Sequence, residues 1–183
     1  KPFGLCFFTF CMMNYLFFMF FDVFWLSNKV GGGKTFVCFF AGWYWSFPAG
    51  KTYFGNKLFL KIKSNFSNIV YLDGDELRSA ISEDLSHSEE DRYISEKRRS
   101  RLSKLLSDQG IHVICSGISN APDIREWNKN NIKGYLEVYL KTTKKTLYNR
   151  DPKGLYRKYL KGEINSIVGE DIEFHEPISP WME

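Results

Sequence analysis

Apolar and polar residues follow two different patterns along the last two thirds of the chain. Short apolar runs that end in polar turns are typical of buried strands, and three of them stand out, at residues 68–75, 111–119 and 135–140. Segments with helical periodicity lie between these runs. Strands that alternate with helices predict βαβ units, so we expect an α/β fold whose parallel sheet is covered by helices on both faces.

The helical segments have apolar residues at intervals of three or four. Residues 54–66 place Phe54, Leu58 and Ile62 four apart, which predicts one apolar face. Residues 89–110 predict a longer helix that ends at a glycine. The buried face of this longer helix is expected to run through Ile94, Arg101, Leu102, Leu105 and Leu106.

The first 60 residues differ in composition from the rest. They hold 15 of the 17 phenylalanines and no glutamate. Residues 3–26 are apolar and long enough for a transmembrane helix, which would tether the protein to a membrane. A signal peptide is a second interpretation, although no small-residue cleavage site follows. A third is that the Phe-rich segment 1–40 is not a selected sequence, because its composition departs from globular usage.

Length and charge restrict the possible function classes. A chain of 183 residues with 44% hydrophobic residues is expected to form a single domain over residues 1–183. The 21 acidic residues are mixed among 25 basic ones, so the net charge of +4 favours a phosphorylated small molecule at least as much as nucleic acid. Three of the four cysteines lie in the first 40 residues without a CxxC pair, which argues against a disulfide framework or zinc finger.

A phosphate-binding loop is the clearest chemical candidate. Residues 45–52, WSFPAGKT, match the end of the pattern G-x-x-x-x-G-K-[ST] and lie between an apolar run and a predicted helix. In such a loop, backbone N–H groups and the lysine hold phosphate, while the Ser/Thr hydroxyl reaches Mg²⁺. Trp45 replaces the first glycine and Pro48 lacks an N–H group, so the first half of the pattern is irregular.

A rival loop lies upstream. Residues 28–35, NKVGGGKT, have Asn28 in the first glycine position and end in the same Gly-Lys-Thr triplet, with Lys34 as its lysine. An ordinary turn before a helix is a further interpretation of either triplet. The two loops can be separated only by the motifs that follow them.

Three motifs follow in order: YLDGDELR at 71–78, SEEDR at 88–92 and RDPKGLYRKYLKGEI at 150–164. Together they resemble the adenylylsulfate kinase family over roughly residues 42–180. The resemblance implies a P-loop NTPase-type fold, a parallel sheet sandwiched by helices, with a mobile lid at 150–165. It also implies a cytoplasmic phosphotransferase that uses ATP and Mg²⁺ to phosphorylate the 3′-hydroxyl of adenosine 5′-phosphosulfate. The family's spacing favours Lys51 over Lys34 as the loop lysine.

The resemblance also implies residue roles. Asp75 is expected to orient or deprotonate the acceptor hydroxyl, and Asp73 and Thr52 are expected to hold Mg²⁺, the aspartate through its water shell. Lys51 completes the catalytic set. ATP is expected to contact Gly50, Lys51, Thr52 and Arg150. The acceptor is expected to contact Asp75, Arg78, His87, Arg92, Ser95, Ile118, Ser119, Lys153, Ser166 and Ile167.

The acceptor side departs from the family's pattern. Family members commonly sandwich adenine between two phenylalanines, at positions that are here His87 and Ile167, and Ser95 replaces an asparagine. Stacking contributes about 1–3 kcal/mol per base, so these changes favour a second interpretation in which the acceptor base differs. Related kinases phosphorylate cytidine diphosphoramidate in capsule biosynthesis. A third interpretation is a catalytically weak nucleotide-binding module, with Trp45 blocking the loop.

The expected partner is a small-molecule nucleotide. The basic stretch EKRRSRLSK at residues 96–104 follows a helical period and contains Glu96, so we interpret it as a solvated helix face and expect no nucleic-acid partner. A membrane partner is not expected either. Family members are often dimers, which makes a homodimer the expected assembly if the protein associates.

Overall fold

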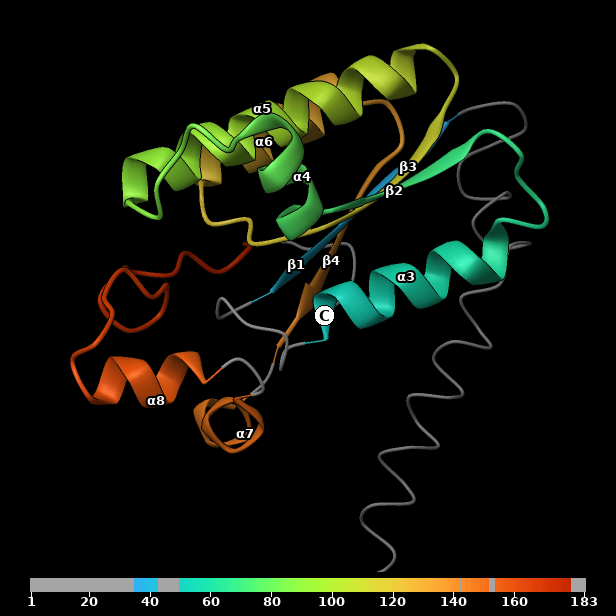
Figure 1. Cartoon of the computed structure of the whole chain (residues 1–183). Helices are drawn as coiled ribbons and strands as arrows, with labels where there is room; N and C mark the ends of the chain where they lie inside the picture. Colours follow the sequence, from blue (N-terminus) through green and yellow to red (C-terminus); the bar gives the residue numbers. More distant parts are fainter. Residues whose placement is uncertain (1–34, 43–49, 142, 152–153, 179–183) are drawn as a thin grey trace, which may run out of the picture. The chain divides into compact units, whose positions relative to one another are not determined.

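The computed structural model describes residues 35–42, 50–141, 143–151 and 154–178, which belong to a compact unit that begins at Thr35 (Figure 1). Residues 1–34 of the Phe-rich segment, which include the rival loop up to Lys34, and the first half of the proposed phosphate loop lie outside the described residues. None of the helices within these ranges is long and apolar enough to cross a membrane. The predicted membrane span at 3–26 is therefore not tested.

Within the described residues, four parallel strands form the central sheet, in the order β2-β3-β1-β4 (Figure 1). At least one helix lies between each strand and the next along the chain, as parallel crossovers require. Every residue of β3 is buried, which explains why its centre, Val113 to Cys115, is a continuous apolar run rather than an alternating one. The strands are β1 Val37–Gly42, β2 Ile69–Asp73, β3 His112–Ser116 and β4 Tyr135–Leu140.

Helices lie on both faces of this sheet. In Figure 1, α3 covers one face, and α5 and α6 lie together over the other. The predicted α/β class with a parallel sheet between helices is thus confirmed. The helices are α3 Lys51–Ile62, α4 Gly74–Ile81, α5 Glu89–Asp108, α6 Pro122–Asn131, α7 Lys144–Arg150 and α8 Leu155–Leu160.

The apolar face predicted for α3 is the face that packs on the sheet. Leu58 and Ile62 are fully buried, and Phe54 is half-buried. These side chains recur at intervals of four residues, so they lie one above the other on the same side of the helix. Burial of this apolar stripe fixes the helix against β1, β2 and β3.

The face predicted for α5 was partly wrong: Leu102 and Leu106 are partly buried, Leu106 against the core, but the other predicted residues are not. Ile94 and Leu105 are exposed, the latter to 56%, and Arg101 lies on the surface with its guanidinium 3.5 Å from the centre of the Trp127 ring. The buried face is polar and rich in small side chains: Glu96, Arg99, Ser100, Ser103 and Ser107. Serines let the helix backbone approach the sheet closely, which apolar periodicity alone does not reveal.

The segment after β4 forms two short helices around a small apolar cluster. Leu147 of α7, Tyr156 of α8 and Ile167 are all buried in it. The carboxylate of Asp151, itself buried, accepts the backbone N–H groups of Tyr156 at 3.3 Å and Arg157 at 3.0 Å, so it caps the start of α8. This segment coincides with the predicted lid, whose movement stays a prediction.

Candidate active site

A cavity of about 280 Å³ opens where β2 and β3 end and α3 begins. The carboxyl ends of parallel strands are where α/β proteins bind ligands. The cavity brings together predicted site residues from five parts of the chain: α3, the end of β2, α4, α5 and the loop after β3. They are Lys51, Thr52, Asp73, Asp75, Arg78, Arg92, Ser95 and Ile118.

The start of α3 has the geometry of an anion site. Gly50 precedes the helix with φ of +81°, and no side chain caps the first turn. The first backbone N–H groups of a helix have no intrahelical acceptor, and the helix dipole is positive there. Lys51 adds a cation at this end, 8% exposed and lining the cavity. The arrangement suits a phosphate group of a nucleotide.

Replacing Gly50 with alanine is expected to destabilise the fold by about 1–2 kcal/mol, because L-residues pay that cost in the left-handed region. A Cβ at Gly50 would also come within 2.9 Å of the Phe54 ring. We expect weaker ATP binding in addition, since the strain lies at the phosphate site. Chemical denaturation and calorimetric ATP titration measure the two effects. The matched variant Gly110→Ala, also at positive φ but with open space around it, separates them: it should cost stability without changing ATP affinity.

Asp73 is the centre of a hydrogen-bond network at the end of β2. Its Oδ2 accepts the hydroxyl protons of Thr52 at 2.8 Å and Ser116 at 3.0 Å, and the Tyr71 hydroxyl lies 3.3 Å away. Its Oδ1 accepts the backbone N–H of Asp75 at 2.9 Å. Burial acts to raise the pKa of Asp73, but these hydrogen bonds outweigh it and hold the pKa below its ordinary value. The carboxylate is therefore ionised at neutral pH.

The Thr52 and Asp73 pair fits a magnesium ion. Both side chains present hard oxygen atoms at the floor of the cavity, 2.8 Å apart. Mg²⁺ prefers such ligands and retains several of its waters. Because Asp73 already accepts several hydrogen bonds, we expect it to act through those waters and the Thr52 hydroxyl to be the direct ligand. When bound, the ion would neutralise charge on the phosphate oxygens.

Asp75 lies in the first turn of α4, where its side chain is exposed and lines the cavity. Asp73 caps this helix through the N–H groups of residues 75 and 76, so the two aspartates are held in a fixed relation by one turn of backbone. The result is two carboxylates with different surroundings, one buried in a network and one open to a ligand. That difference suits different roles for the two groups.

Two arginines, Arg78 and Arg92, line the cavity and lie near enough for their charges to interact. Arg92 donates from Nε to the His87 carbonyl at 2.9 Å and from Nη2 to the Ser166 carbonyl at 2.9 Å. Burial and the nearby Arg78 lower the pKa of Arg92 to about 10, while Asp171 acts in the opposite direction. Neighbouring guanidinium groups repel each other, so an anion bound between them would relieve the repulsion.

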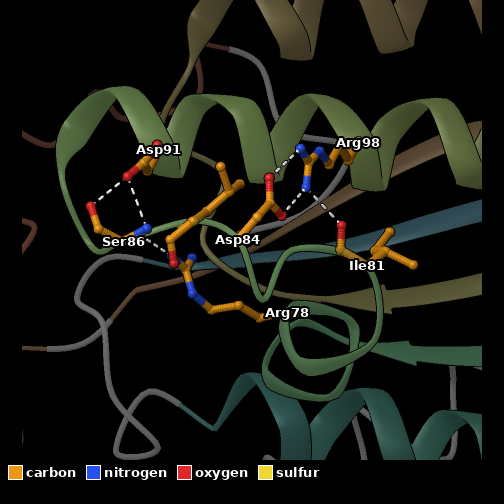
Figure 2. Close-up of polar contacts among 7 residues, drawn as sticks. Arg78, Ile81, Asp84, Ser86, Asp91 and Arg98 are labelled. Atoms are coloured by element: carbon orange, nitrogen blue, oxygen red, sulfur yellow. Dashed lines mark hydrogen bonds and ion pairs between the residues drawn. The ribbon is translucent and has the colours of Figure 1, made fainter.

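The loop between α4 and α5, whose carbonyl groups accept hydrogen bonds from Arg78, is itself bonded to α5 (Figure 2). Arg78 donates to the carbonyls of Leu85 and Ser86, and Ser86 donates from its backbone N–H to Asp91 at 2.8 Å. Arg98 forms a two-pronged ion pair with Asp84, at 2.6 and 2.8 Å, and also donates to the Ile81 carbonyl. These contacts hold Arg78 close to the start of α5 before any ligand binds.

The imidazole of His87 is expected to report on anion binding. Burial, then the charges of Arg78 and Arg92, lower its pKa below the ordinary value, while Asp75 opposes them. A bound anion would offset the two arginine charges, so we expect the pKa of His87 to rise when the acceptor binds. This lowered pKa favours the neutral imidazole in the free protein, and protonation requires a lower pH than for an ordinary histidine. Histidine NMR titration with and without acceptor measures this; an unchanged pKa would place the anion elsewhere.

The family profile of adenylylsulphate kinases matches residues 23–183 of the chain. The chain belongs to this family. Its members are phosphotransferases that act on a hydroxyl group, and the parallel sheet with its phosphate-loop helix is the P-loop kinase architecture expected of one.

Individual relatives agree with the family assignment. A cytidine diphosphoramidate kinase from Campylobacter jejuni is 40% identical over 129 residues, which cover 70% of this chain and 75% of that protein. A probable adenylyl-sulfate kinase from Archaeoglobus fulgidus is 37% identical over 132 residues, 72% of this chain and 85% of that protein. The structure of the Mycobacterium tuberculosis APS kinase with AMPPNP and APS superimposes with a TM-score of 0.72 at 30% identity, covering 81% of this chain and 87% of that one.

Some predicted residues of this adenylylsulfate kinase family member lie away from the cavity. The Ser119 hydroxyl is buried and donates to Glu96 at 2.7 Å, and Ile167 is 1% exposed within the cluster under α7 and α8. His87 and Ser166 contribute carbonyl groups to Arg92 rather than cavity walls. The side chain of Arg150 and all of Lys153 lie outside the described residues, as does Trp45.

Sequence reasoning missed several polar residues of the site in this family member, including the following four. Tyr71 and Ser116 belong to the Asp73 network, and Glu96 and Arg99 line the cavity from α5. A signal existed for two of them, because Glu96 and Arg99 lie four and seven residues after Arg92 and therefore on the same side of a helix. Tyr71 lies two residues before Asp73 on the same strand, and Ser116 reaches Asp73 through the pairing of β2 with β3.

Proposed function

We propose that the protein is an ATP- and Mg²⁺-dependent kinase that transfers the γ-phosphoryl group of ATP to a ribose hydroxyl of a nucleotide. One observation carries the proposal: a phosphate-binding helix start, two aspartates and a pair of arginines line a single cavity. Phosphoryl transfer depends on positioning and on charge stabilisation around the transferred group, and these residues supply both.

The roles divide between the two sides of the cavity. Lys51 and the first N–H groups of α3 receive the phosphates of ATP, and Thr52 and Asp73 hold the magnesium ion. Asp75 orients the acceptor hydroxyl and accepts its proton as the new bond forms. Arg78 and Arg92 bind the anionic 5′ substituent of the acceptor. In-line transfer then requires only that the hydroxyl oxygen face the γ-phosphorus.

Adenosine 5′-phosphosulfate is the first acceptor that we propose. The family assignment supports it, and so does the Mycobacterium tuberculosis enzyme, whose structure was determined with AMPPNP and APS. The proposal places the phosphosulfate group against the arginine pair. It leaves adenine without the two phenylalanines that family members commonly stack on it, since His87 and Ile167 occupy those positions.

Cytidine diphosphoramidate is a second acceptor, favoured by specific observations. The Campylobacter jejuni relative that is 40% identical bears that activity in its name. Ile167 is 1% exposed beside Leu147 and Tyr156, so this position offers no stacking surface for a large base. A capsule-related role would follow for the protein if this acceptor is the correct one.

The experiment is phosphoryl transfer from ATP to each acceptor in parallel, with ADP release followed and the product identified by mass spectrometry. Preference for the phosphosulfate would mean that the adenine pocket is repacked around His87. Preference for the cytidine compound would make His87 and Ile167 specificity determinants. ATP binding without transfer to either acceptor would contradict the proposed activity and favour a nucleotide-binding module.

A further inference from the structure

Arg99 is a third arginine of the cavity, and no role in the proposed reaction has been given to it. It lies on α5 and lines the cavity, although its side chain is only 8% exposed. Arg92 and Arg99 are seven residues apart on the helix, which is about two turns or roughly 10 Å along one side. Ser95 lines the cavity between them. The wall of the cavity that α5 forms therefore carries two positive charges, about two helical turns apart.

The guanidinium of Arg99 is tightly enclosed. Its Nη2 donates to the Ile118 carbonyl, and it lies above the Phe39 ring, 6.0 Å from the ring centre. A Cβ at Gly117 would approach Nη1 to 2.1 Å, and a Cβ at Gly74 would approach it to 3.5 Å. Glycines at these two positions leave room for a charged group beside the Asp73–Asp75 segment. The Arg99 guanidinium therefore lies close to the turn that carries Asp75, the proposed catalytic carboxylate.

The hydrogen-bonding capacity of Arg99 is not used up. Its Nε is buried and has no hydrogen-bond partner within the described part of the chain. The carboxylate of Glu96, whose charge interacts with Arg99, is bonded to the loop after β3, where it accepts the Ser119 hydroxyl at 2.7 Å and the N–H groups of Asn120 at 3.0 Å and Ala121 at 3.3 Å. An unpaired donor on a buried charged group is costly, so an acceptor oxygen from a ligand would be strongly favoured there.

We propose that Arg99 binds the second anionic group of the acceptor, the sulfuryl or terminal phosphoryl group, while Arg78 and Arg92 bind the first. This inference rests on the proposed function and adds a specificity residue to it. The position favours the acceptor over ATP because Arg99 belongs to the helix of Arg92 and contacts the loop of Ile118, whereas ATP enters at α3. The guanidinium fork suits the tetrahedral oxygens of either group.

The test compares ligands that differ only in the second anionic group. Affinities of AMP and adenosine 5′-phosphosulfate, and of CMP and CDP, are measured by calorimetry with AMPPNP saturating the ATP site. Arg99→Met is expected to weaken binding of the two-group ligand roughly 10- to 100-fold, the effect of losing a charge-assisted hydrogen bond, and to change binding of the monophosphate less than twofold. The KM for ATP should stay unchanged.

Two further variants keep the test decisive. Arg101→Met removes a guanidinium from the same helix but outside the cavity, so it should leave all affinities unchanged. Arg99→Lys keeps the positive charge, so it should bind the two-group ligand more tightly than Arg99→Met does. This second comparison applies also where Arg99→Met is poorly folded. The role of Arg99 would be overturned if Arg99→Met weakened binding of the monophosphate as much as binding of the two-group ligand, or if it raised the KM for ATP, while the wild-type protein transfers phosphate. Absence of transfer by the wild-type protein would overturn the proposed function, and this inference with it.

Discussion

Replacing Asp75 with asparagine is expected to lower kcat by roughly 100- to 10,000-fold, the usual contribution of a general base. Asp75 lies at the cavity wall, in the first turn of the helix that Asp73 caps. Asparagine preserves the size of the side chain but cannot accept the proton of the acceptor hydroxyl. The backbone N–H bond to Asp73 at 2.9 Å is retained, so the geometry of the turn should survive.

The measurement combines two readouts. Single-turnover transfer gives the rate of the chemical step, and calorimetric titration with ATP shows whether the donor site is intact. Glu76→Gln is the matched control, because this neighbouring carboxylate is exposed and does not line the cavity. We expect its rate to stay within a few-fold of wild type. A similar loss in both variants, or a loss below tenfold in Asp75→Asn, would mean that another group takes the proton.

Strand positions could be predicted from sequence because burial on both faces leaves a clear trace. The run that became β3 is buried over its whole length and apolar at its centre, from Val113 to Cys115, and β2 ends at Asp73, where α4 begins directly in place of the predicted turn. Burial of the helices was less predictable. On α3 the predicted stripe through Leu58 and Ile62 is buried, but on α5 the buried residues are serines together with a carboxylate and a guanidinium. Small and polar side chains, rather than an apolar stripe, make up that buried face.

The functional site likewise contains residues that the sequence could predict and residues that it could not. Motif spacing predicted Lys51, Thr52 and Asp73 because each follows a local signal, a helix start or a strand end. Ser116 lies 43 residues from Asp73 and reaches it because β2 and β3 pair with these two residues opposite each other. A single sequence contains no record of that register. Ile167 is the converse case, since a position expected to contact the acceptor has its side chain in a buried cluster.

Replacing Lys51 with alanine is expected to lower kcat/KM for ATP by roughly 100- to 1,000-fold, as the loss of one preorganised donor to a transferring group commonly does. Lys51 is 8% exposed and stands at the first position of α3, where its charge adds to the helix dipole. Steady-state kinetics at varied ATP concentration, with thermal unfolding as a check on folding, measures the effect. Lys51→Met, which keeps most of the side-chain volume, should lose as much activity as alanine.

Lys34→Ala is the control that tests the choice of loop. Both lysines end a Gly-Lys-Thr triplet, so they are matched in local sequence and differ only in what surrounds them. Lys51 is followed by α3 and shares a cavity with Asp73, whose carboxylate bonds Thr52 at 2.8 Å. This link between loop and strand end is what a metal-assisted phosphate site requires. If Lys34→Ala proved the more damaging change, the link between Thr52 and Asp73 would be structural, and residues 28–35 would be the working phosphate loop.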